Sequence, residues 1–282
     1  MKVSVCVLTY NHRDYIEAAL NGICGQNRDS FALEVLIADD SSTDGTFEIC
    51  TSYASKFDFI KVLPSEGNLG MEANFSRLLN AATGDFIAIC EGDDYWCDTE
   101  KLQKQVQVFQ QRPEVTACYH NAKILLEDKF GNTVYPESNP AEITFEQLVD
   151  GRFMKTCTLV LRNRQGLFED IVNRKLPADD TSLCYIALDS GGVAYYINEV
   201  MAVYRVHSGG VWSMLSKEKQ LRWAENSFSK YVIYYRGRKE TKKLKVQLQK
   251  TRRELIVLLV RKLDFSVISV FGRMMRDIFS IG

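Results

Sequence analysis

The chain has 282 residues, 46% of them hydrophobic and 25% charged, so it has the composition of an ordinary globular protein. Residues 1–215 carry 30 acidic and 18 basic side chains, whereas the rest carries 6 acidic and 17 basic ones. No run approaches the roughly eighteen uninterrupted apolar residues of a membrane span. The eight cysteines are scattered without a CxxC pair. This argues against a disulfide framework or zinc site and is typical of buried thiols in a reducing compartment.

Short apolar runs alternate with amphipathic segments in the first half of the chain. The predicted strands are Val3–Leu8, Leu33–Ala38, Phe59–Leu63 and Phe86–Cys90, and the predicted helices are Asp14–Cys24, Gly45–Lys56, Met71–Ala82 and Glu100–Gln111. The first apolar run is too short for a signal peptide, so we interpret it as a strand. This repetition predicts an α/β fold with a mostly parallel, Rossmann-like sheet and helices on both faces. Ligands of such sheets bind beyond the carboxyl ends of the strands.

The pattern becomes mixed from Val115 onwards. We expect strands at Ala117–Leu126 and Thr156–Leu161, one or two strands over Val193–Val206, a loop near Gly131-Asn132, and helices at Phe145–Val149, Arg164–Asn173 and Thr181–Asp189. These elements would complete the sheet and cover its crevice. The predicted organisation is therefore a domain over residues 1–215, with halves at 1–114 and 115–215, followed by a helical extension over 216–282.

The extension is basic and amphipathic. Leucines recur near helical spacing with Lys and Arg between them, and the stretch over 263–281 is apolar with few charges; the leucines are Leu244, Leu248, Leu255 and Leu258/Leu259. Two interpretations stay open. Residues 240–282 lie in an anionic membrane surface, or the helices pack their apolar face on the body or on another subunit, as in a homo-oligomer.

An acidic cluster, Glu91-Gly92-Asp93-Asp94, comes directly after the predicted strand Phe86–Cys90. Neighbouring carboxylates raise one another's pKa, and a divalent cation with oxygen ligands would offset their repulsion. A solvated turn is the alternative, because Gly-Asp-Asp is ordinary turn chemistry. The first strand ends at Thr9-Tyr10-Asn11 and the second at Asp39-Asp40-Ser41-Ser42. Three strand ends thus bring polar groups to one edge, which favours a site.

Together with Asn68-Leu69-Gly70, these segments resemble the family 2 glycosyltransferases of GT-A fold. A second block, Pro177–Leu183 with Tyr204–Ser213, resembles later motifs of the same family. The resemblance covers roughly the first three quarters of the chain. It implies inverting transfer of a sugar from a nucleotide donor to an acceptor hydroxyl. The implied donor is a UDP- or dTDP-sugar, with UDP favoured.

The resemblance also implies a set of site residues. Glu91, Asp93 and Asp94 match the family's Asp-x-Asp metal motif, with Glu in the first place, and His207 approaches the metal or the diphosphate. The implied cofactor is Mn²⁺ or Mg²⁺. The residues that would contact the nucleotide sugar are Thr9, Tyr10, Asn11, Asp39, Asp40, Asn68, Gly70, Gly92 and Arg205. For Asp39 and Asp40, a helix cap is the alternative role.

Inversion in one displacement requires a base that deprotonates the incoming hydroxyl. Asp180 aligns best with the family's base, with Asp179 as the alternate assignment. The alternative is a plain helix start, for which Pro-x-Asp-Asp-Thr-Ser is well suited. Trp96 and Trp212 would form apolar walls for sugars or belong to the core.

Two other functions compete with glycosyl transfer as interpretations of these motifs. A nucleotidyltransferase would favour a Gly-rich, basic first turn, but the sequence there is Thr-Tyr-Asn-His-Arg-Asp. A non-catalytic, transferase-like binding module would have lost its acids, yet Asp93, Asp94 and Asp180 are present. We expect a cytoplasmic enzyme of surface-polysaccharide biosynthesis, peripheral on the inner face of the plasma membrane. Its expected partners are a nucleotide-sugar donor and a saccharide or lipid-linked saccharide acceptor, and not a nucleic acid.

Overall fold

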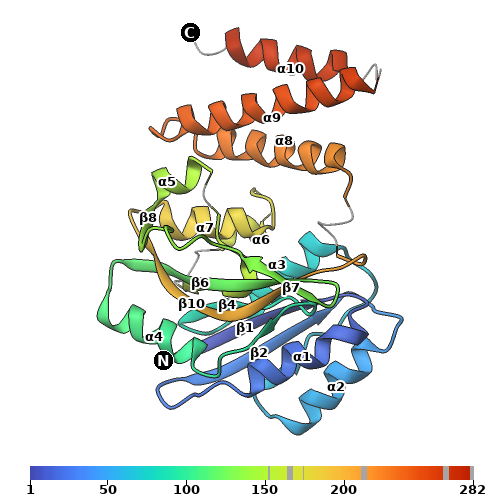
Figure 1. The fold of residues 1–282 in the computed structure, drawn as a ribbon, viewed down its shortest axis with the longest axis vertical. Coiled ribbons are helices and arrows are strands. Elements are labelled where there is room, and N and C mark those ends of the chain that lie inside the picture. Colours follow the sequence, from blue (N-terminus) through green and yellow to red (C-terminus); the bar gives the residue numbers. More distant parts are fainter. Residues whose placement is uncertain (152, 164–167, 174, 211–214, 263–266, 280–282) are drawn as a thin grey trace.

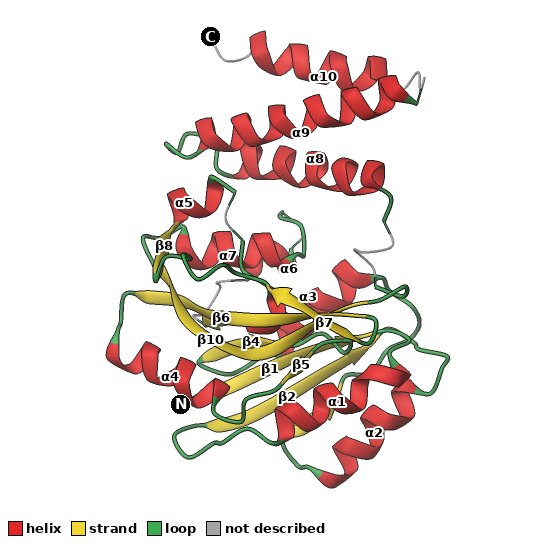
Figure 2. Cartoon of the chain, viewed as in Figure 1, coloured by secondary structure: helices red, strands yellow, loops and turns green. Residues whose placement is uncertain are grey.

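The structure is a computed structural model that describes residues 1–151, 153–163, 168–173, 175–210, 215–262 and 267–279. Ten strands form one sheet with helices on both of its faces (Figures 1 and 2). The strands are β1 Lys2–Thr9, β2 Ala32–Asp39, β3 Ile60–Val62, β4 Phe86–Ile89, β5 Tyr95–Trp96, β6 Val115–Leu126, β7 Lys129–Thr133, β8 Glu142–Thr144, β9 Val160–Arg162 and β10 Val193–Val206. The helices are α1 Arg13–Cys24, α2 Thr46–Lys56, α3 Met71–Ala81, α4 Lys101–Gln111, α5 Phe145–Val149, α6 Glu169–Val172, α7 Asp180–Leu188, α8 Lys217–Tyr234, α9 Thr241–Arg261 and α10 Val267–Phe279, with a 3₁₀ helix, η1, at Thr156–Thr158.

The strand order is β3-β2-β1-β4-β9-β6-β10-β5. Strands β1 to β4 are mutually parallel where they pair, and β6 and β10 are parallel to each other. Between these groups β9 runs antiparallel to both β4 and β6. The predicted α/β class with a mostly parallel first half is therefore confirmed. Because β2, β1 and β4 are neighbours, their carboxyl ends meet at one edge.

Each face of the sheet has its own apolar core. Helices α1, α2 and α4 cover one face, where Ile16, Leu20 and Leu102 are fully buried. Helices α3, α5 and α7 cover the other face, together with part of α8. This double coverage explains why the parallel strands are nearly continuous apolar runs, because both faces of each strand are buried.

The predicted strand Thr156–Leu161 is wrong in its first half. Residues Thr156–Thr158 form the 3₁₀ helix, and β9 begins only at Val160. Side chains from other elements bond to this segment's carbonyls. The Trp96 indole donates to the Cys157 carbonyl over 2.8 Å, and the Gln105 amide donates to the Thr158 carbonyl over 3.0 Å. These bonds replace the ladder that a strand would need.

Other boundaries also differ from expectation. The segment near Gly131-Asn132 lies inside β7, whose five residues are all exposed, so it lacks the alternating apolar pattern of a half-buried strand. Within the predicted helix Arg164–Asn173, only Glu169–Val172 is helical among the described residues, and positions 164–167 lie outside them. Val193–Val206 is one strand. The short strands β5 and β8 were not predicted.

Helices α8, α9 and α10 stack in that order at one end of the molecule (Figure 1). The leucine stripe of α9 faces inwards, as its spacing predicts; the buried members are Leu244, Leu248, Leu255 and Leu259. The carboxylate of Glu225 on α8 accepts hydrogen bonds from Arg252 on α9 and Arg273 on α10. One carboxylate thus links the three helices. The division at residues 215/216 stays a proposal, because α8 shares its core with the body.

Strand β10 pairs with β6 in an irregular register. The pairing shifts between Ile197 and Val200 and again between Val200 and Ala202. Each shift places extra residues of β10 against β6, as in a β-bulge. From Ala202 onwards the pairing is regular up to Val206, which brings the end of β10 to the site edge.

Two helical glycines give a stability test. A Cβ at Gly22 of α1 would lie 2.5 Å from the Trp96 carbonyl oxygen, whereas a Cβ at Gly272 of α10 would meet nothing within 4 Å. We expect Gly22→Ala to destabilise the protein by about 1–3 kcal/mol through overpacking. Gly272→Ala should be neutral or stabilise by up to about 1 kcal/mol, because alanine favours a helix. Urea unfolding of both variants measures the difference, and the same sign in both would contradict the contact.

Candidate active site

The polar ends of three strands meet at the carboxyl edge of the sheet. Thr9 of β1 pairs with Asp39 of β2. The Gly92 N–H, after β4, donates to the Leu8 carbonyl over 2.7 Å. A Cβ at Gly92 would lie 2.7 Å from the Thr9 hydroxyl oxygen, so the approach of these segments requires glycine. The structure therefore assembles the motifs that the sequence placed on separate strands.

The carboxylates of Asp39 and Asp40 are both buried and both accept hydrogen bonds from the protein. Asp39 accepts from the N–H and the hydroxyl of Ser42, at 2.9 and 2.5 Å. Asp40 accepts from the N–H groups of Leu69 and Gly70, at 2.7 and 2.9 Å. These bonds organise the loops after β2 and before α3. The two acids therefore shape the edge as well as lining it.

The remaining predicted nucleotide contacts lie around this edge. Tyr10 is 45% exposed, which leaves its ring face accessible for a base to stack upon. Asn11 adopts a left-handed conformation, with φ of 54°, and its side-chain oxygen accepts from the Thr43 N–H over 2.9 Å. The Asn68 amide donates to the Asp40 carbonyl over 3.1 Å. The Thr9 hydroxyl is buried without a hydrogen-bond partner in the described part of the chain.

The acidic cluster places its three carboxylates in three different environments. Both oxygens of Glu91 accept from the Thr156 hydroxyl, at 2.8 and 2.7 Å. Asp94 is 1% exposed, and one of its oxygens accepts from the Arg205 N–H over 2.8 Å. Its other oxygen is buried without a partner among the described residues. Asp93 alone faces a histidine, with its carboxylate 3.1 Å from the Nε2 of His207.

These environments separate the pKa values of the cluster. Burial raises the pKa of Glu91 to about 7, with the charge of Asp93 adding to the effect. Burial also raises the pKa of Asp94 well above its usual range. Burial would raise the pKa of Asp93 too, but the His207 hydrogen bond and the nearby His12 bring it below the ordinary value. Asp93 is therefore the member that is most readily ionised.

Among the described residues, no group of three or more His, Cys, Asp or Glu side chains is arranged to hold a metal ion. Of the four predicted ligands, the structure brings Asp93 and His207 together, while Glu91 and Asp94 are bonded elsewhere. Magnesium commonly binds proteins through one or two carboxylates and takes its other ligands from substrate phosphates and water. Asp93 supplies one such carboxylate.

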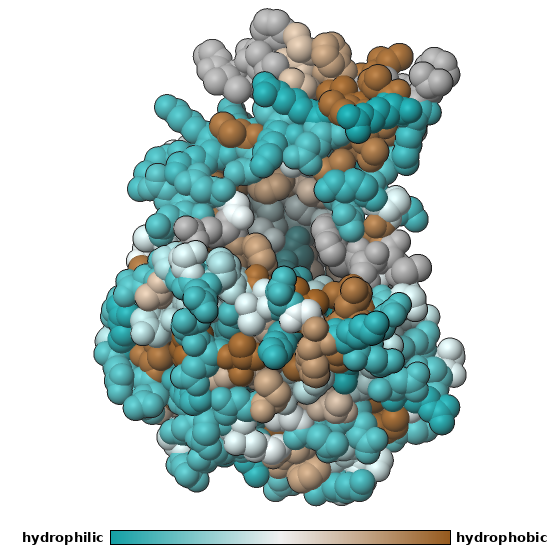
Figure 3. All heavy atoms as spheres, in the orientation of Figure 1, coloured by the Kyte–Doolittle hydropathy of each residue, from teal (hydrophilic) through white to brown (hydrophobic). Residues whose placement is uncertain are grey.

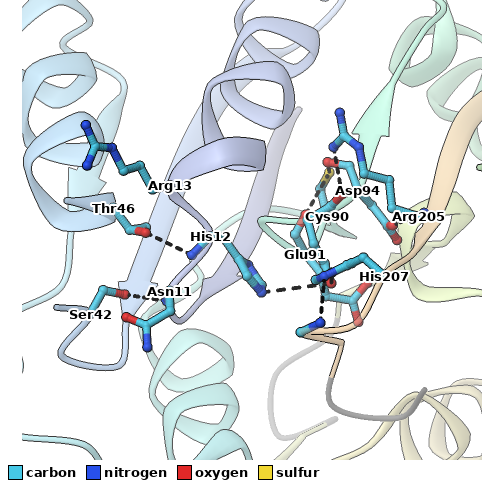
Figure 4. Close-up of polar contacts among 12 residues, drawn as sticks. Asn11, His12, Arg13, Ser42, Thr46, Cys90, Glu91, Asp94, Arg205 and His207 are labelled. Carbon is cyan, nitrogen blue, oxygen red and sulfur yellow. Dashed lines mark hydrogen bonds and ion pairs between the residues drawn. The ribbon is translucent and has the colours of Figure 1, made fainter. Parts of the chain in front are cut away.

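Arg205 and His207 are held at the end of β10 by aromatic rings and backbone groups. The Arg205 guanidinium lies 4.5 Å from the Tyr95 ring centroid and donates to the Asp93 carbonyl over 2.7 Å. The His207 ring centroid lies 4.5 Å from that of Tyr15, and Figure 4 shows the rings of His12 and His207 pointing towards each other. A cavity of about 420 Å³ opens beside them, between the start of α1, the β6–β7 turn and the end of β10.

The two candidate bases at the start of α7 have different surroundings. Asp179 is the N-cap residue, and its carboxylate accepts from the Ser182 N–H and the Tyr231 hydroxyl, at 2.8 and 2.9 Å. The carboxylate of Asp180 accepts from the Thr181 N–H over 2.8 Å. Burial raises the pKa of Asp180, and the positive charge of Lys155 opposes that rise. Asp179 thus caps the helix, whereas Asp180 does not, so the two candidates differ in how free their carboxylates are.

Sequence reasoning did not anticipate Lys155, Thr156, His12 and Tyr15 as parts of this region. Lys155 lies 4.0 Å from the Tyr204 ring centroid and interacts electrostatically with Asp180 and Glu91. Its neighbourhood in the sequence looked like an ordinary strand, so no signal marked it. His12 directly follows the Thr-Tyr-Asn motif and Tyr15 lies four residues after that motif, so their nearness to it was the available signal. Trp96 is buried and belongs to the core, and Trp212 lies outside the described residues.

The comparisons with known proteins agree with this geometry. The family model described as Glycosyl transferase family 2 matches residues 4–167. The chain belongs to this family. The chain is also 31% identical over 223 residues to the UDP-Glc:alpha-D-GlcNAc-diphosphoundecaprenol beta-1,3-glucosyltransferase WfaP of Escherichia coli. This match covers 77% of this chain and 82% of WfaP. The family expected from the motifs is confirmed.

Two further comparisons show how much of the chain and of its relatives is alike. An uncharacterised protein of Mycobacterium tuberculosis is 35% identical over 223 residues, and the match spans 78% of this chain but only 63% of that relative. The crystal structure of Staphylococcus aureus TarS 1–349 in complex with UDP-GlcNAc superposes with a TM-score of 0.68 and 22% identity, covering 89% of this chain and 71% of that one. At this identity the likeness shows the GT-A fold, which the sequence predicted.

The positive charge of Lys155 gives a prediction for this member of glycosyl transferase family 2. The substitution Lys155→Met removes the positive charge that lowers the pKa of Asp180, so we expect the pKa of Asp180 to rise. If Asp180 acts as an ionised base, the acidic limb of the rate–pH profile should move to higher pH. Lys155→Arg keeps the charge and should leave the limb in place. An unmoved limb in Lys155→Met would contradict the electrostatic role.

Proposed function

We propose that this chain transfers a sugar with inversion from a nucleotide-sugar donor, of the UDP class, to an acceptor hydroxyl. The observation that carries the proposal is the meeting of the Asp93 carboxylate and the His207 Nε2, 3.1 Å apart, at the sheet edge where Asp39 and Asp40 are buried. The electrostatic interactions of Lys155 with both Asp180 and Glu91 support a base near the acidic loop. WfaP is named as using UDP-Glc, and the TarS structure holds UDP-GlcNAc, which supports the UDP class.

The proposed reaction is a single displacement. Asp180 accepts the proton of the acceptor hydroxyl, the acceptor oxygen bonds to the anomeric carbon, and the bond from that carbon to the diphosphate oxygen breaks. A cavity of about 20 Å³ lies beside Asp180, with Phe153 and Met154 in its walls. It is about large enough for one water or hydroxyl oxygen. This is the group that a base must reach.

Asp93 and His207 would hold a divalent cation, Mn²⁺ or Mg²⁺, on the diphosphate. When bound, the ion supplies electrostatic stabilisation of the negative charge that develops on the leaving group. Asp93 suits this role because its pKa is lowered and its carboxylate is ionised. Tyr10, Asp39 and the Asn68–Gly70 loop form the edge on which the nucleoside would lie.

Asp180→Asn tests the base. The amide is close in shape but cannot take the proton, so we expect kcat to fall by about 10²–10⁴-fold. Turnover of UDP-glucose, UDP-galactose and UDP-N-acetylglucosamine to UDP measures this, with calorimetric titration of UDP as the binding control. UDP affinity should be unchanged. Equal turnover by wild type and variant would sink the assignment of Asp180.

Asp93→Asn tests the metal proposal by binding alone. Calorimetry of UDP with and without Mn²⁺ should show a metal-dependent gain in affinity for the wild type. That gain should fall at least 10–100-fold in the variant, which is roughly the range that lost supporting contacts of metal ligands produce. Metal-independent UDP binding in both proteins would refute the Asp93 site. UDP binding without any turnover would favour a non-catalytic binding module.

We further propose that α9 and α10 contact an anionic membrane surface that presents a lipid-linked acceptor. The end of α9 and the start of α10 expose apolar side chains beside basic ones, and brown spheres gather there in Figure 3. The apolar members are Val257, Val260, Ile268 and Phe271, and the exposed basic ones are Arg253, Arg261, Lys262 and Arg276. Such a surface suits anionic lipid headgroups. The WfaP acceptor is named as a diphosphoundecaprenol saccharide, which supports a lipid-borne acceptor.

In the described residues, no helix has both the length and the apolarity to cross a bilayer. In the proposed contact with the membrane surface, the exposed ring of Phe271 would enter the lipid headgroup region. We expect Phe271→Asp to weaken binding to phosphatidylglycerol-containing vesicles by roughly tenfold. The substitution removes apolar area that would be buried in the membrane, and it adds a negative charge that the anionic lipids repel. Phe130→Asp is the matched control, since Phe130 is 58% exposed on β7 and Phe271 is 52% exposed. Equal flotation of both variants and wild type would contradict the surface.

A further inference from the structure

Helix α8 of the C-terminal extension is hydrogen-bonded to the start of α7. Tyr231 is 1% exposed, and its hydroxyl donates to the Asp179 carboxylate over 2.9 Å. The same hydroxyl lies 3.0 Å from the Ser182 hydroxyl oxygen. Because the Tyr231 proton goes to the carboxylate, the Ser182 hydroxyl is the donor of the second bond. Ser182, Tyr231 and Asp179 thus form a buried hydrogen-bonded chain.

This chain ends on the residue that begins α7. The Asp179 carboxylate caps the helix by accepting from the Ser182 N–H over 2.8 Å. A helix begins with N–H groups that have no partner inside the helix, so the cap determines where the first turn lies. Asp180 is the first residue of that turn. The position of the Asp180 carboxylate therefore depends on how Asp179 is held.

The Tyr231 ring is also fixed by packing. Its centroid lies 4.9 Å from that of Tyr185, one turn further along α7, so α8 contacts α7 at two successive places. Tyr231 belongs to the same buried apolar cluster as Leu183 and Tyr185. Helix α8 is thus a neighbour of the helix that bears the candidate base, and the contact between them is both apolar and polar.

From these contacts we infer that Tyr231 is a positioning residue for Asp180, so the C-terminal extension completes the catalytic site. The inference rests on the proposed role of Asp180 as the base. Tyr231 acts through Asp179. The C-terminal extension thus has a role in catalysis that is separate from any contact of α9 and α10 with a membrane.

Tyr231→Phe is the direct test, because it removes one oxygen and keeps the ring. Tyr234→Phe is the matched control, since Tyr234 lies on the same helix and its hydroxyl bonds to Asp170 of α6 instead. Both variants are made in the full chain. Hydrogen exchange followed by mass spectrometry reports the first turn of α7 without any substrate. We expect exchange over residues 180–184 to rise roughly tenfold in Tyr231→Phe, the size of effect that loss of a bond to a charged group produces, and not in Tyr234→Phe.

Kinetics give the second readout, with whichever of UDP-glucose, UDP-galactose or UDP-N-acetylglucosamine the wild type hydrolyses fastest. We expect kcat in Tyr231→Phe to fall roughly tenfold or more while the donor KM stays within about twofold, because misplacing a base impairs only the chemical step. Combining Tyr231→Phe with Asp179→Ala should add little further loss, since the tyrosine acts through that carboxylate. Additive losses would overturn the inference.

The outcomes separate this inference from the proposed function. Unchanged exchange over residues 180–184 in Tyr231→Phe overturns the positioning role, whatever the kinetics show. Equal kcat values for Tyr231→Phe and Tyr234→Phe, with equal losses of thermal stability, also overturn it. If Asp180→Asn retains full turnover, the proposed base fails, and a rise in exchange would still support the contact. If no donor is hydrolysed, the exchange experiment decides alone.

Discussion

The hydrogen bond from the Arg205 N–H to the Asp94 carboxylate joins two parts of the chain that lie 111 residues apart. It ties the end of β10 to the loop after β4, and the other features of the site follow from that contact. The guanidinium of Arg205 can then donate to the Asp93 carbonyl, and His207, two residues on, reaches the Asp93 side chain. Burying an ionised Asp94 would be unfavourable, and the raised pKa shows how the protein relieves that penalty.

The acidic cluster is tolerated because its members do not behave alike. Three carboxylates within four residues would repel one another if all were ionised, and a bound cation is one way to offset the repulsion. The structure shows a second way. Glu91 and Asp94 are buried and have raised pKa values, whereas Asp93 faces histidines and has a lowered one. Neighbouring groups whose environments push their pKa values apart are typical of catalytic sites.

Much of this could be predicted from the sequence because the relevant signals are local. The first four strands are mostly apolar runs, and the meeting of the motifs at their ends follows from the rule that neighbouring parallel strands share a carboxyl edge. The hydrogen bonds of Asp40 and Glu91 could not be predicted, because their partners are distant in the sequence. Asp40 accepts from the backbone of Leu69, 29 residues away, and Glu91 accepts from Thr156, 65 residues away. The short strands β5 and β8 escaped prediction because two or three residues carry no periodicity. The start of β9 was misplaced because indole and amide donors from other elements take up its carbonyls.

The register shifts of β10 have a consequence for how the family's chains can vary in length. Side chains alternate between the two faces of a strand, so an odd change in the number of residues between Ile197 and Ala202 would turn Arg205 to the opposite face. The number of residues in the bulged segment therefore determines which face of the sheet each later side chain of β10 occupies. A single-residue insertion or deletion there would reverse which side chains of β10 meet the acidic loop, and it would turn the buried Ala202 and Val203 to the opposite faces as well. A change of one residue in the length of this segment therefore exchanges the two faces of β10, whereas a change of two residues keeps each side chain on its own face.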